Sequence, residues 1–262
     1  AALDAELGKA PMEELSRISG GQSNPTYFVT HGGRRMVLRK QPNGEILKGA
    51  HAIDREYRVM KALGAQGVPV PEMIHYHEGA DAIGTPFYLM ERLEGRVFED
   101  CSLPGLKPDE RRAMYEAMAQ AMARMHAVDA EAAGLGDYGK PGNYFERSIG
   151  RWSKQYKAAE TETVAAMDKL IEWLPEHAPA QERTSVVHGD YRLDNMIFHP
   201  TEPRVIAVLD WELSTLGDPL ADFTYQLMQW RTPKDIRNGF LGQDLKAMGI
   251  PTEEEYVKAY CE

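Results

Sequence analysis

Hydrophobic and polar positions follow a strand-like pattern in the first third of the chain, up to about residue 90. Residues 26–30 and 34–39 are short runs rich in β-branched and aromatic side chains, and Gly32-Gly33 separates them. Such runs around a glycine pair predict a β-hairpin. Residues 86–91 predict a further strand, which Gly95 follows.

In most of the remaining chain, apolar residues recur at the spacing of an α-helix. Residues 52–63 predict a helix that ends at Gly64, and Pro108 marks the start of another. Residues 142–177 predict one or more further helices. Apolar side chains that recur at helical spacing after Pro108 predict a buried face, in which methionine is a gap-filling core residue: Met114, Ala117, Met118, Ala121, Met122 and Met125.

Composition narrows the class of protein. The 262 residues are 43% hydrophobic and 27% charged, as in ordinary globular proteins. A formal net charge of −10 opposes sequence-independent nucleic-acid binding, which relies on Lys and Arg. No apolar run reaches membrane-spanning length, and the first residues lack a secretory pattern. Cys101 and Cys261 form no metal-binding spacing, so we expect a cytoplasmic protein.

Three polar side chains carry the chemistry. Asp190 follows a Val-Val-His-Gly run, Asn195 comes five residues later, and Asp210 ends the β-branched run 205–209. Phosphoryl transfer needs little covalent help, so its catalysts position an acceptor and clamp the phosphates with metal. In that reading Asp190 takes the proton of the acceptor hydroxyl, while Asn195 and Asp210 hold Mg²⁺.

This block resembles a known family. The spacing from Asp190 to Asn195 is that of protein-kinase catalytic loops, and residues 210–212 replace Asp-Phe-Gly with Asp-Trp-Glu. Together with residues 217–223, the block resembles the aminoglycoside phosphotransferase family of small-molecule kinases. Residues 37–42 and 51–58 resemble more narrowly the kinase domains attached to acyl-CoA dehydrogenases, so a fused or associated dehydrogenase is an expected partner.

The resemblance implies an α+β, two-lobed, protein-kinase-like fold. We expect residues 1–93 to form a small β-rich nucleotide-binding lobe and residues 94–262 a larger, mainly helical catalytic and acceptor-binding lobe. Family members usually continue further, so we expect the second lobe to be truncated at its C-terminus. ATP and Mg²⁺ are the implied cofactors, although the sequence does not distinguish ATP from GTP. It leaves the oligomeric state open as well.

Nucleotide-binding residues are expected in the first lobe. Ser23 and Asn24 end a glycine-containing stretch that is suited to ATP phosphates, although an ordinary turn fits equally well. By resemblance, Arg39 contacts phosphate and Glu56 orients it, with the neighbouring Lys40 as the alternative. Further cofactor contacts are expected at the interlobe connection, from Met90, Glu91 and Leu93.

Several other charged or polar residues surround the catalytic block, and we expect most of them to have structural roles. Arg192 either balances charge on the γ-phosphoryl group, as a catalytic residue, or pairs with a neighbouring acid. His188 and Asp194 are interpreted as structural. Asp218 and Asp222 are interpreted as supports for the catalytic loop, with Asp218 the nearer to the site.

The acceptor is the least determined feature. The short interval after Asp210 leaves no room for a long activation segment, which favours a small-molecule kinase over a protein kinase. One helix face carries three cations, Arg147, Arg151 and Lys154. These cations favour an anionic or thioester-linked acceptor. The alternative is that the face is only a solvated surface. A hydroxyacyl acid or hydroxyacyl-CoA is the expected acceptor. The alternatives are an aminoglycoside, or a catalytically silent nucleotide-binding regulatory module.

Overall fold

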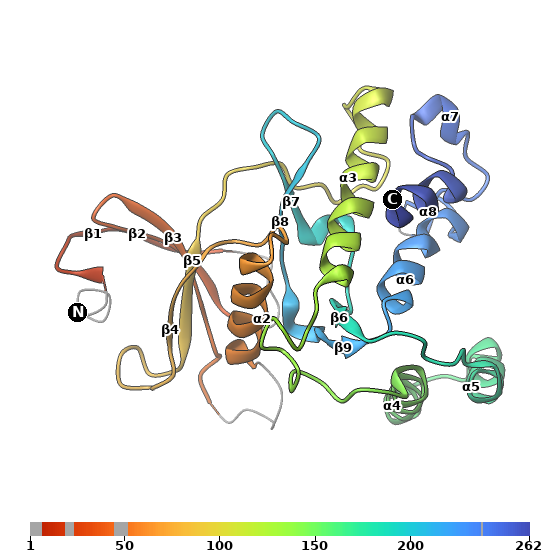
Figure 1. Cartoon of the computed structure of the whole chain (residues 1–262), viewed down its shortest axis with the longest axis horizontal. Helices are drawn as coiled ribbons and strands as arrows, with labels where there is room; N and C mark the ends of the chain where they lie inside the picture. The colour runs from red at the N-terminus through yellow and green to blue at the C-terminus, as the bar shows by residue number, and fades with distance from the viewer. Residues whose placement is uncertain (1–6, 19–23, 45–51, 237) are drawn as a thin grey trace.

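The structure is a computed structural model that describes residues 7–18, 24–44, 52–236 and 238–262. The first lobe is a five-stranded antiparallel sheet with strand order β1-β2-β3-β5-β4 (Figure 1). The strands are β1 (Met12–Arg17), β2 (Thr26–His31), β3 (Arg34–Lys40), β4 (Met73–His77) and β5 (Phe87–Glu91).

The predicted hairpin is present and sets the register of the sheet. Gly32 and Gly33 have φ of 58° and 76°, a backbone region that glycine enters without steric cost. Thr26 therefore lies opposite Arg39, and His31 lies opposite Arg34. In this register Arg39 lies near the end of β3, next to β5, where its side chain lines the cavity that faces the second lobe.

Helix α2 (Ile53–Ala65) stands between the sheet and the helical lobe (Figure 1). Its buried side chains, among them Val59 and Leu63, join the main hydrophobic core. The helix runs through Gly64, so the predicted end at that residue is wrong; the chain leaves the helix at Gly67, where φ is 78°. A glycine inside a helix is tolerated when packing holds the segment.

The second lobe is mainly helical and is built around α3. The helices are α3 (Pro108–Ala127), α4 (Tyr144–Ala159), α5 (Ala165–His177), α6 (Leu220–Arg231), α7 (Leu245–Met248) and α8 (Glu253–Cys261). Two small ribbons and two short 3₁₀ turns carry the catalytic block: β6 (Ser185–Val187) with β9 (Thr215–Gly217), β7 (Met196–Phe198) with β8 (Val205–Val208), η1 (Leu193–Asn195) and η2 (Trp211–Leu213).

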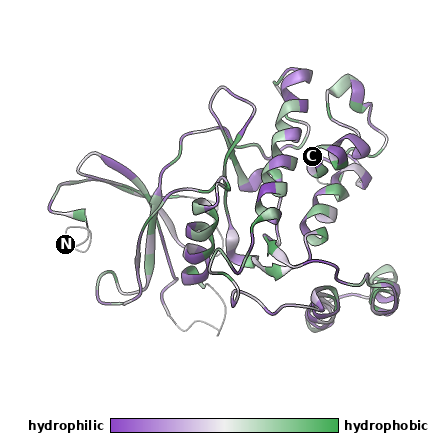
Figure 2. Cartoon of the chain, in the orientation of Figure 1, coloured by the Kyte–Doolittle hydropathy of each residue, from purple (hydrophilic) through white to green (hydrophobic). Residues whose placement is uncertain are grey.

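The core of this lobe lies where α3, α6 and α8 meet the ribbons. Met114, Met118, Met122 and Met125 are fully or almost fully buried, which confirms the predicted apolar face of α3. In Figure 2 green hydrophobic segments alternate with purple hydrophilic ones along α3, and the helix packs against β6 and β8. None of the described helices is long and apolar enough to cross a membrane. The α+β fold with a β-rich first lobe and a helical second lobe is confirmed.

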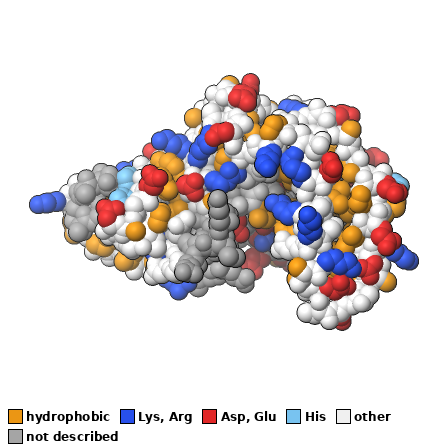
Figure 3. Space-filling model, turned by 90° about the horizontal axis from the view of Figure 1, so that it is seen from below, with side chains coloured by type: hydrophobic (Ala, Val, Ile, Leu, Met, Phe, Trp, Pro, Cys, Tyr) orange, Lys and Arg blue, Asp and Glu red, His pale blue; other side chains and the backbone are white. Residues whose placement is uncertain are grey.

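Helices α4 and α5 lie apart from the core, at the lower edge of the molecule (Figure 1). Neither helix contributes a buried residue. Arg147, Arg151 and Lys154 are all exposed on α4. Figure 3 shows Lys and Arg side chains gathered on the underside, the side on which α4 lies.

Candidate active site

A cavity of about 530 Å³ lies between the two lobes. Its walls come from the sheet, from α2, from the connection after β5, and from the residues around η1 and β8. Ser23 lies outside the described residues. The other expected cofactor and metal residues all line this one cavity: Asn24, Arg39, Glu56, Met90, Glu91, Leu93, Asn195 and Asp210.

Glu56 is the buried centre of the sheet side of the cavity. Its side chain is 2% exposed. Oε2 of Glu56 lies 2.9 Å from Nε of Arg39 and accepts a 3.0 Å hydrogen bond from Tyr88. Asn24 donates a 2.8 Å hydrogen bond to Oε1. Burial raises the pKa of Glu56, and Arg39 and Tyr88 oppose that rise. These partners hold the carboxylate in one orientation.

Arg39 connects the two lobes. Its guanidinium lies 3.3 Å from Oδ1 of Asp210 and 3.9 Å from Oε2 of Glu212, in addition to Glu56. Burial alone lowers the pKa of Arg39, but the surrounding acidic groups outweigh it and the net shift is upward. Lys40 points elsewhere and donates to Asn43 at 2.8 Å. Of the two neighbouring cations, Arg39 is therefore the one that lines the cleft.

Asp190 is held at both oxygens. Tyr225 donates to Oδ1 at 3.0 Å. Nε of Arg192 and Nδ2 of Asn195 donate to Oδ2 at 3.1 and 3.0 Å. Asn195 also donates to the Asp190 backbone oxygen at 2.9 Å. Arg192 also pairs with Asp194, at 3.1 Å. In this structure Arg192 therefore forms salt bridges with neighbouring acidic residues, which is the second of the two alternatives expected from the sequence.

Asp222 anchors the loop that carries Asp190. Its carboxylate is 1% exposed and accepts hydrogen bonds from the backbone N–H groups of His188 and Gly189, at 2.6 and 2.8 Å. His126 approaches the same carboxylate at 3.3 Å. Asp218 instead accepts from Leu220 N at 2.9 Å, a bond within the start of α6. Asp222 therefore supports the loop directly, whereas the nearer approach expected of Asp218 is not seen.

His188 is a neutral, structural side chain. Its Nε2 lies 2.8 Å from the Leu209 carbonyl oxygen, so Nε2 donates, and Nδ1 accepts from the Asp190 backbone N–H at 3.2 Å. Burial lowers the pKa of His188 below its ordinary value, while Asp222 opposes that shift. The ring thus ties the segment before Asp210 to the loop that contains Asp190.

Asp210 has a strained backbone. Its φ is 65° and its ψ is 59°, the left-handed region that non-glycine residues rarely occupy. Strain of this kind costs about 1–3 kcal/mol and persists only where the surroundings enforce it. Here the Leu209 N–H donates to the Asn195 carbonyl oxygen at 2.8 Å, and Trp211 is buried immediately afterwards. The carboxylate consequently faces Arg39 across the cleft.

Oxygen donors of the kind Mg²⁺ prefers are present in the cleft. Asn195 uses Nδ2 for both of its bonds to Asp190, and Oδ1 accepts no hydrogen bond from the described part of the chain. Asp210 supplies a carboxylate to the same cavity. Among the described residues, no group of three or more His, Cys, Asp and Glu side chains is placed to hold a metal. One carboxylate and one amide oxygen, completed by phosphate and water, fit Mg²⁺.

Comparison with known proteins identifies the family. The sequence profile of the phosphotransferase enzyme family (APH) matches residues 14–257. The chain belongs to this family. It is 53% identical over 253 residues to acyl-CoA dehydrogenase family member 10 of Mus musculus, covering 96% of this chain and 24% of that protein. The phosphotransferase chain therefore spans about a quarter of the length of that relative.

Solved structures agree with this assignment. A crystal structure of a Ralstonia eutropha protein assigned as an aminoglycoside phosphotransferase has a TM-score of 0.89 and 51% identity, covering 99% of this chain and 78% of that one. The streptomycin–ATP ternary complex of APH(2")-IIa has a TM-score of 0.66 and 18% identity, covering 99% and 80%. The latter likeness shows the fold alone. The family and the kinase-like fold expected from the sequence are both confirmed.

Proposed function

We propose that this phosphotransferase moves the γ-phosphoryl group of ATP to a hydroxyl of a small molecule. The observation that supports this most is the position of Asp190. Its partner Asn195 lines the interlobe cleft, and its partners Arg192 and Tyr225 line a second cavity on the side of α6. A base at such a junction meets a nucleotide from one side and an acceptor from the other.

In the proposed reaction the acceptor oxygen attacks the γ-phosphorus as the bond to the β-phosphate oxygen breaks, and ADP leaves. Asp190 receives the hydroxyl proton. Arg192 shifts from its acidic neighbours toward the transferred group. Arg39, held by Glu56, contacts the phosphates, with Asn24 nearby, and Met90, Glu91 and Leu93 contact the rest of the nucleotide. Ser23 stays a proposed phosphate contact from the sequence alone.

Magnesium would be held by Asn195 and Asp210, and when bound it neutralises phosphate charge. The oxygen donors described above support this assignment. The ATP in the APH(2")-IIa complex supports ATP as the donor for this chain as well. We also propose that the lobes divide at residues 1–93 and 94–262, because β5 ends at Glu91 and α3 begins at Pro108.

For the acceptor we propose a hydroxyacyl acid or hydroxyacyl-CoA. Similarity to an acyl-CoA dehydrogenase family member supports acyl chemistry and a fused or associated dehydrogenase. The exposed cations of α4 line a surface groove with Gly142 and Asn143, where they are compatible with an anionic tail. An aminoglycoside, the acceptor type of the structural relatives, is the alternative. A silent nucleotide-binding module is disfavoured because Asp190, Asn195 and Asp210 are all in place.

Mass spectrometry tests the proposal. The protein is incubated with Mg-ATP and a panel of hydroxyacyl thioesters, hydroxy acids, sugars and aminoglycosides, and phosphorylated products are sought. A gain of one phosphoryl group on a hydroxyacyl compound, abolished by Asp190→Ala, is the expected result. If aminoglycosides alone are phosphorylated, the acceptor proposal is wrong. If no compound is phosphorylated although nucleotide binds, the silent-module alternative is favoured.

A further inference from the structure

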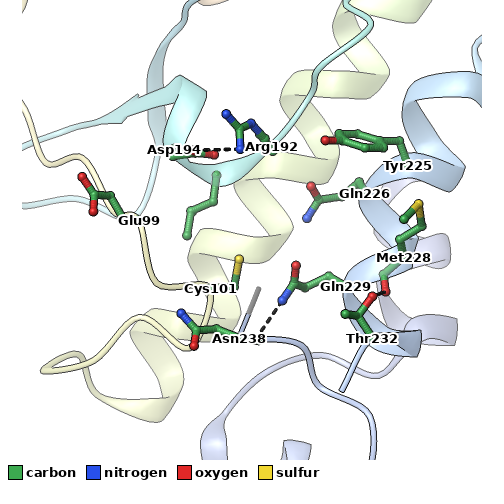
Figure 4. Close-up of a pocket in the computed structure, with 11 residues that line it drawn as sticks. Glu99, Cys101, Arg192, Asp194, Tyr225, Gln226, Met228, Gln229, Thr232 and Asn238 are labelled. Carbon is green, nitrogen blue, oxygen red and sulfur yellow. Dashed lines mark hydrogen bonds and ion pairs between the residues drawn. The ribbon is translucent and has the colours of Figure 1, made fainter. Parts of the chain in front are cut away.

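The second cavity beside Asp190 has a volume of about 200 Å³ (Figure 4). It lies between the catalytic loop, the connection before α3, and α6. Arg192 and Tyr225 line it, and both also bond Asp190. Asp194 is the one residue that lines both this cavity and the interlobe cleft. The cavity is therefore separated from the proposed base by two of its own hydrogen-bond partners, and it contains none of the residues proposed for ATP.

Charge in this cavity is nearly balanced. Its charged lining residues are Glu99, Arg192 and Asp194, and Arg192 pairs with Asp194 and with Asp190. Glu99 is the remaining lining carboxylate among the described residues. A polycation needs several carboxylates, and a free carboxylate ligand would face Glu99, Asp190 and Asp194. The cavity consequently favours an uncharged ligand over an aminoglycoside or a free hydroxy acid.

Gln226 presents a side-chain amide to this cavity. The residue is 6% exposed, and no hydrogen bond joins its side chain to another described residue. Figure 4 shows its amide pointing into the cavity, between the catalytic loop and Cys101. Neighbouring polar groups are already engaged: Gln229 donates to the Asn238 carbonyl oxygen at 2.9 Å, and Thr232 donates to the Met228 carbonyl oxygen at 2.7 Å. The amide of Gln226 therefore faces the cavity with its donor and acceptor atoms available to a ligand.

We propose that Gln226 donates a hydrogen bond from Nε2 to the carbonyl oxygen of a hydroxyacyl thioester or amide, whose uncharged acyl part occupies this cavity with its hydroxyl against Asp190. The inference rests on the proposed function and narrows it. A carbonyl oxygen accepts but does not donate, which matches the amide N–H₂. Because the hydroxyl and the carbonyl belong to one molecule, contacts at Asp190 and Gln226 together orient the hydroxyl for transfer.

Two variants of one residue test this with 3-hydroxybutanoyl-N-acetylcysteamine thioester as acceptor. Gln226→Met keeps the approximate shape but removes the donor, and Gln226→Glu replaces it with a carboxylate that repels a carbonyl oxygen. Each is expected to lower kcat/KM for the thioester about tenfold or more, with KM for ATP unchanged. Gln120→Met, at an exposed position of α3, makes the same substitution away from the cavity and is expected to behave as wild type.

A binding measurement separates failure of this inference from failure of the proposed function. The side-chain amide resonances of Gln226 are assigned in the wild type by their absence in Gln226→Met. They are expected to shift when the thioester is added and to stay in place when kanamycin is added. Resonances that shift while no phosphorylated product forms would support the site and contradict the function. Product formation with unchanged kcat/KM in both variants and unmoved resonances would overturn the inference.

Discussion

The Tyr225 hydroxyl donates a 3.0 Å hydrogen bond to Oδ1 of Asp190, whereas Arg192 and Asn195 share Oδ2. The two oxygens of the carboxylate thus have different partners from different elements. Tyr225 comes from α6, and the other two come from the catalytic loop and η1. This arrangement fixes the plane of the carboxylate and leaves Oδ1 with a single hydrogen-bond partner among the described residues, from the side of α6. The acceptor hydroxyl must therefore share Oδ1 with Tyr225 or displace it.

Removing the Tyr225 hydroxyl tests that relationship. Tyr225→Phe is expected to lower kcat roughly tenfold to a hundredfold, because a hydrogen bond to a charged group is worth about 1.5–3 kcal/mol. KM for ATP should not change, since Tyr225 does not line the interlobe cleft. Steady-state kinetics measure both. Tyr57→Phe, which removes a hydroxyl from the opposite lobe, serves as the control, and an equal loss in both variants would contradict a specific role.

Arg39 and Lys40 allow a paired comparison of neighbouring cations. Arg39→Met leaves Glu56 buried without its cation and removes the contact with Asp210, so KM for ATP is expected to rise at least tenfold. Lys40→Met loses a bond to Asn43 on the surface and is expected to leave KM within about twofold. Nucleotide affinity by calorimetry gives an independent readout. A larger effect at Lys40 would reverse the assignment.

Asp222 is expected to matter for stability and activity together. Asp222→Asn turns one of two accepting oxygens into a donor that faces the N–H groups of His188 and Gly189. The unfolding free energy should fall by about 1–3 kcal/mol, and kcat should fall because the loop carrying Asp190 shifts. Urea unfolding and kinetics measure the two effects. The exposed Asp81→Asn is the control. Normal kcat in a destabilised Asp222→Asn would show that the loop position does not depend on this carboxylate.

The buried His188 predicts a direction of pH dependence. Burial lowers its folded pKa below the ordinary 6.5, so the unfolded chain binds a proton more readily. Its stabilising contribution is complete above about pH 6.5 and is lost as the pH falls from there through the folded pKa. Urea unfolding between pH 5 and 8 should show the difference between wild type and His188→Asn shrinking at low pH. A difference that grows as the pH falls would contradict this sign.

Sequence predicted local features more fully than it predicted tertiary contacts. The β2–β3 hairpin follows from two glycines between β-rich runs, and the buried face of α3 follows from methionines at helical spacing. Strand β1 was not predicted, because an exposed pattern around Glu13 and Glu14 gives little periodicity. Strand β9 has only three residues, and its pairing with β6 is non-local. Such pairings depend on packing rather than on propensity.

In the candidate site, too, residues identified by local spacing were predicted, whereas residues brought in by tertiary contacts were not. Spacing within one loop indicated Asp190 and Asn195, and a strand ending abruptly indicated Asp210. Tyr225 was missed because it lies 35 residues after Asp190, on a helix whose pattern is otherwise that of core packing. No residue spacing specifies such a contact. Gln226 was missed for the same reason, since a glutamine in a helix is ordinary until its surroundings are known to be buried.

Arg55 of α2 has a consequence for how the cleft opens. Its guanidinium donates to the carbonyl oxygens of Tyr138 and Ser214 at 2.7 and 3.3 Å and stacks over the Tyr138 ring. These bonds fasten α2 to the second lobe. Hydrogen exchange of α2 amides should therefore follow the helical lobe, and the five-stranded sheet should open as a separate unit. Separation of the sheet from α2 would break the bonds of Glu56 to Arg39, Tyr88 and Asn24.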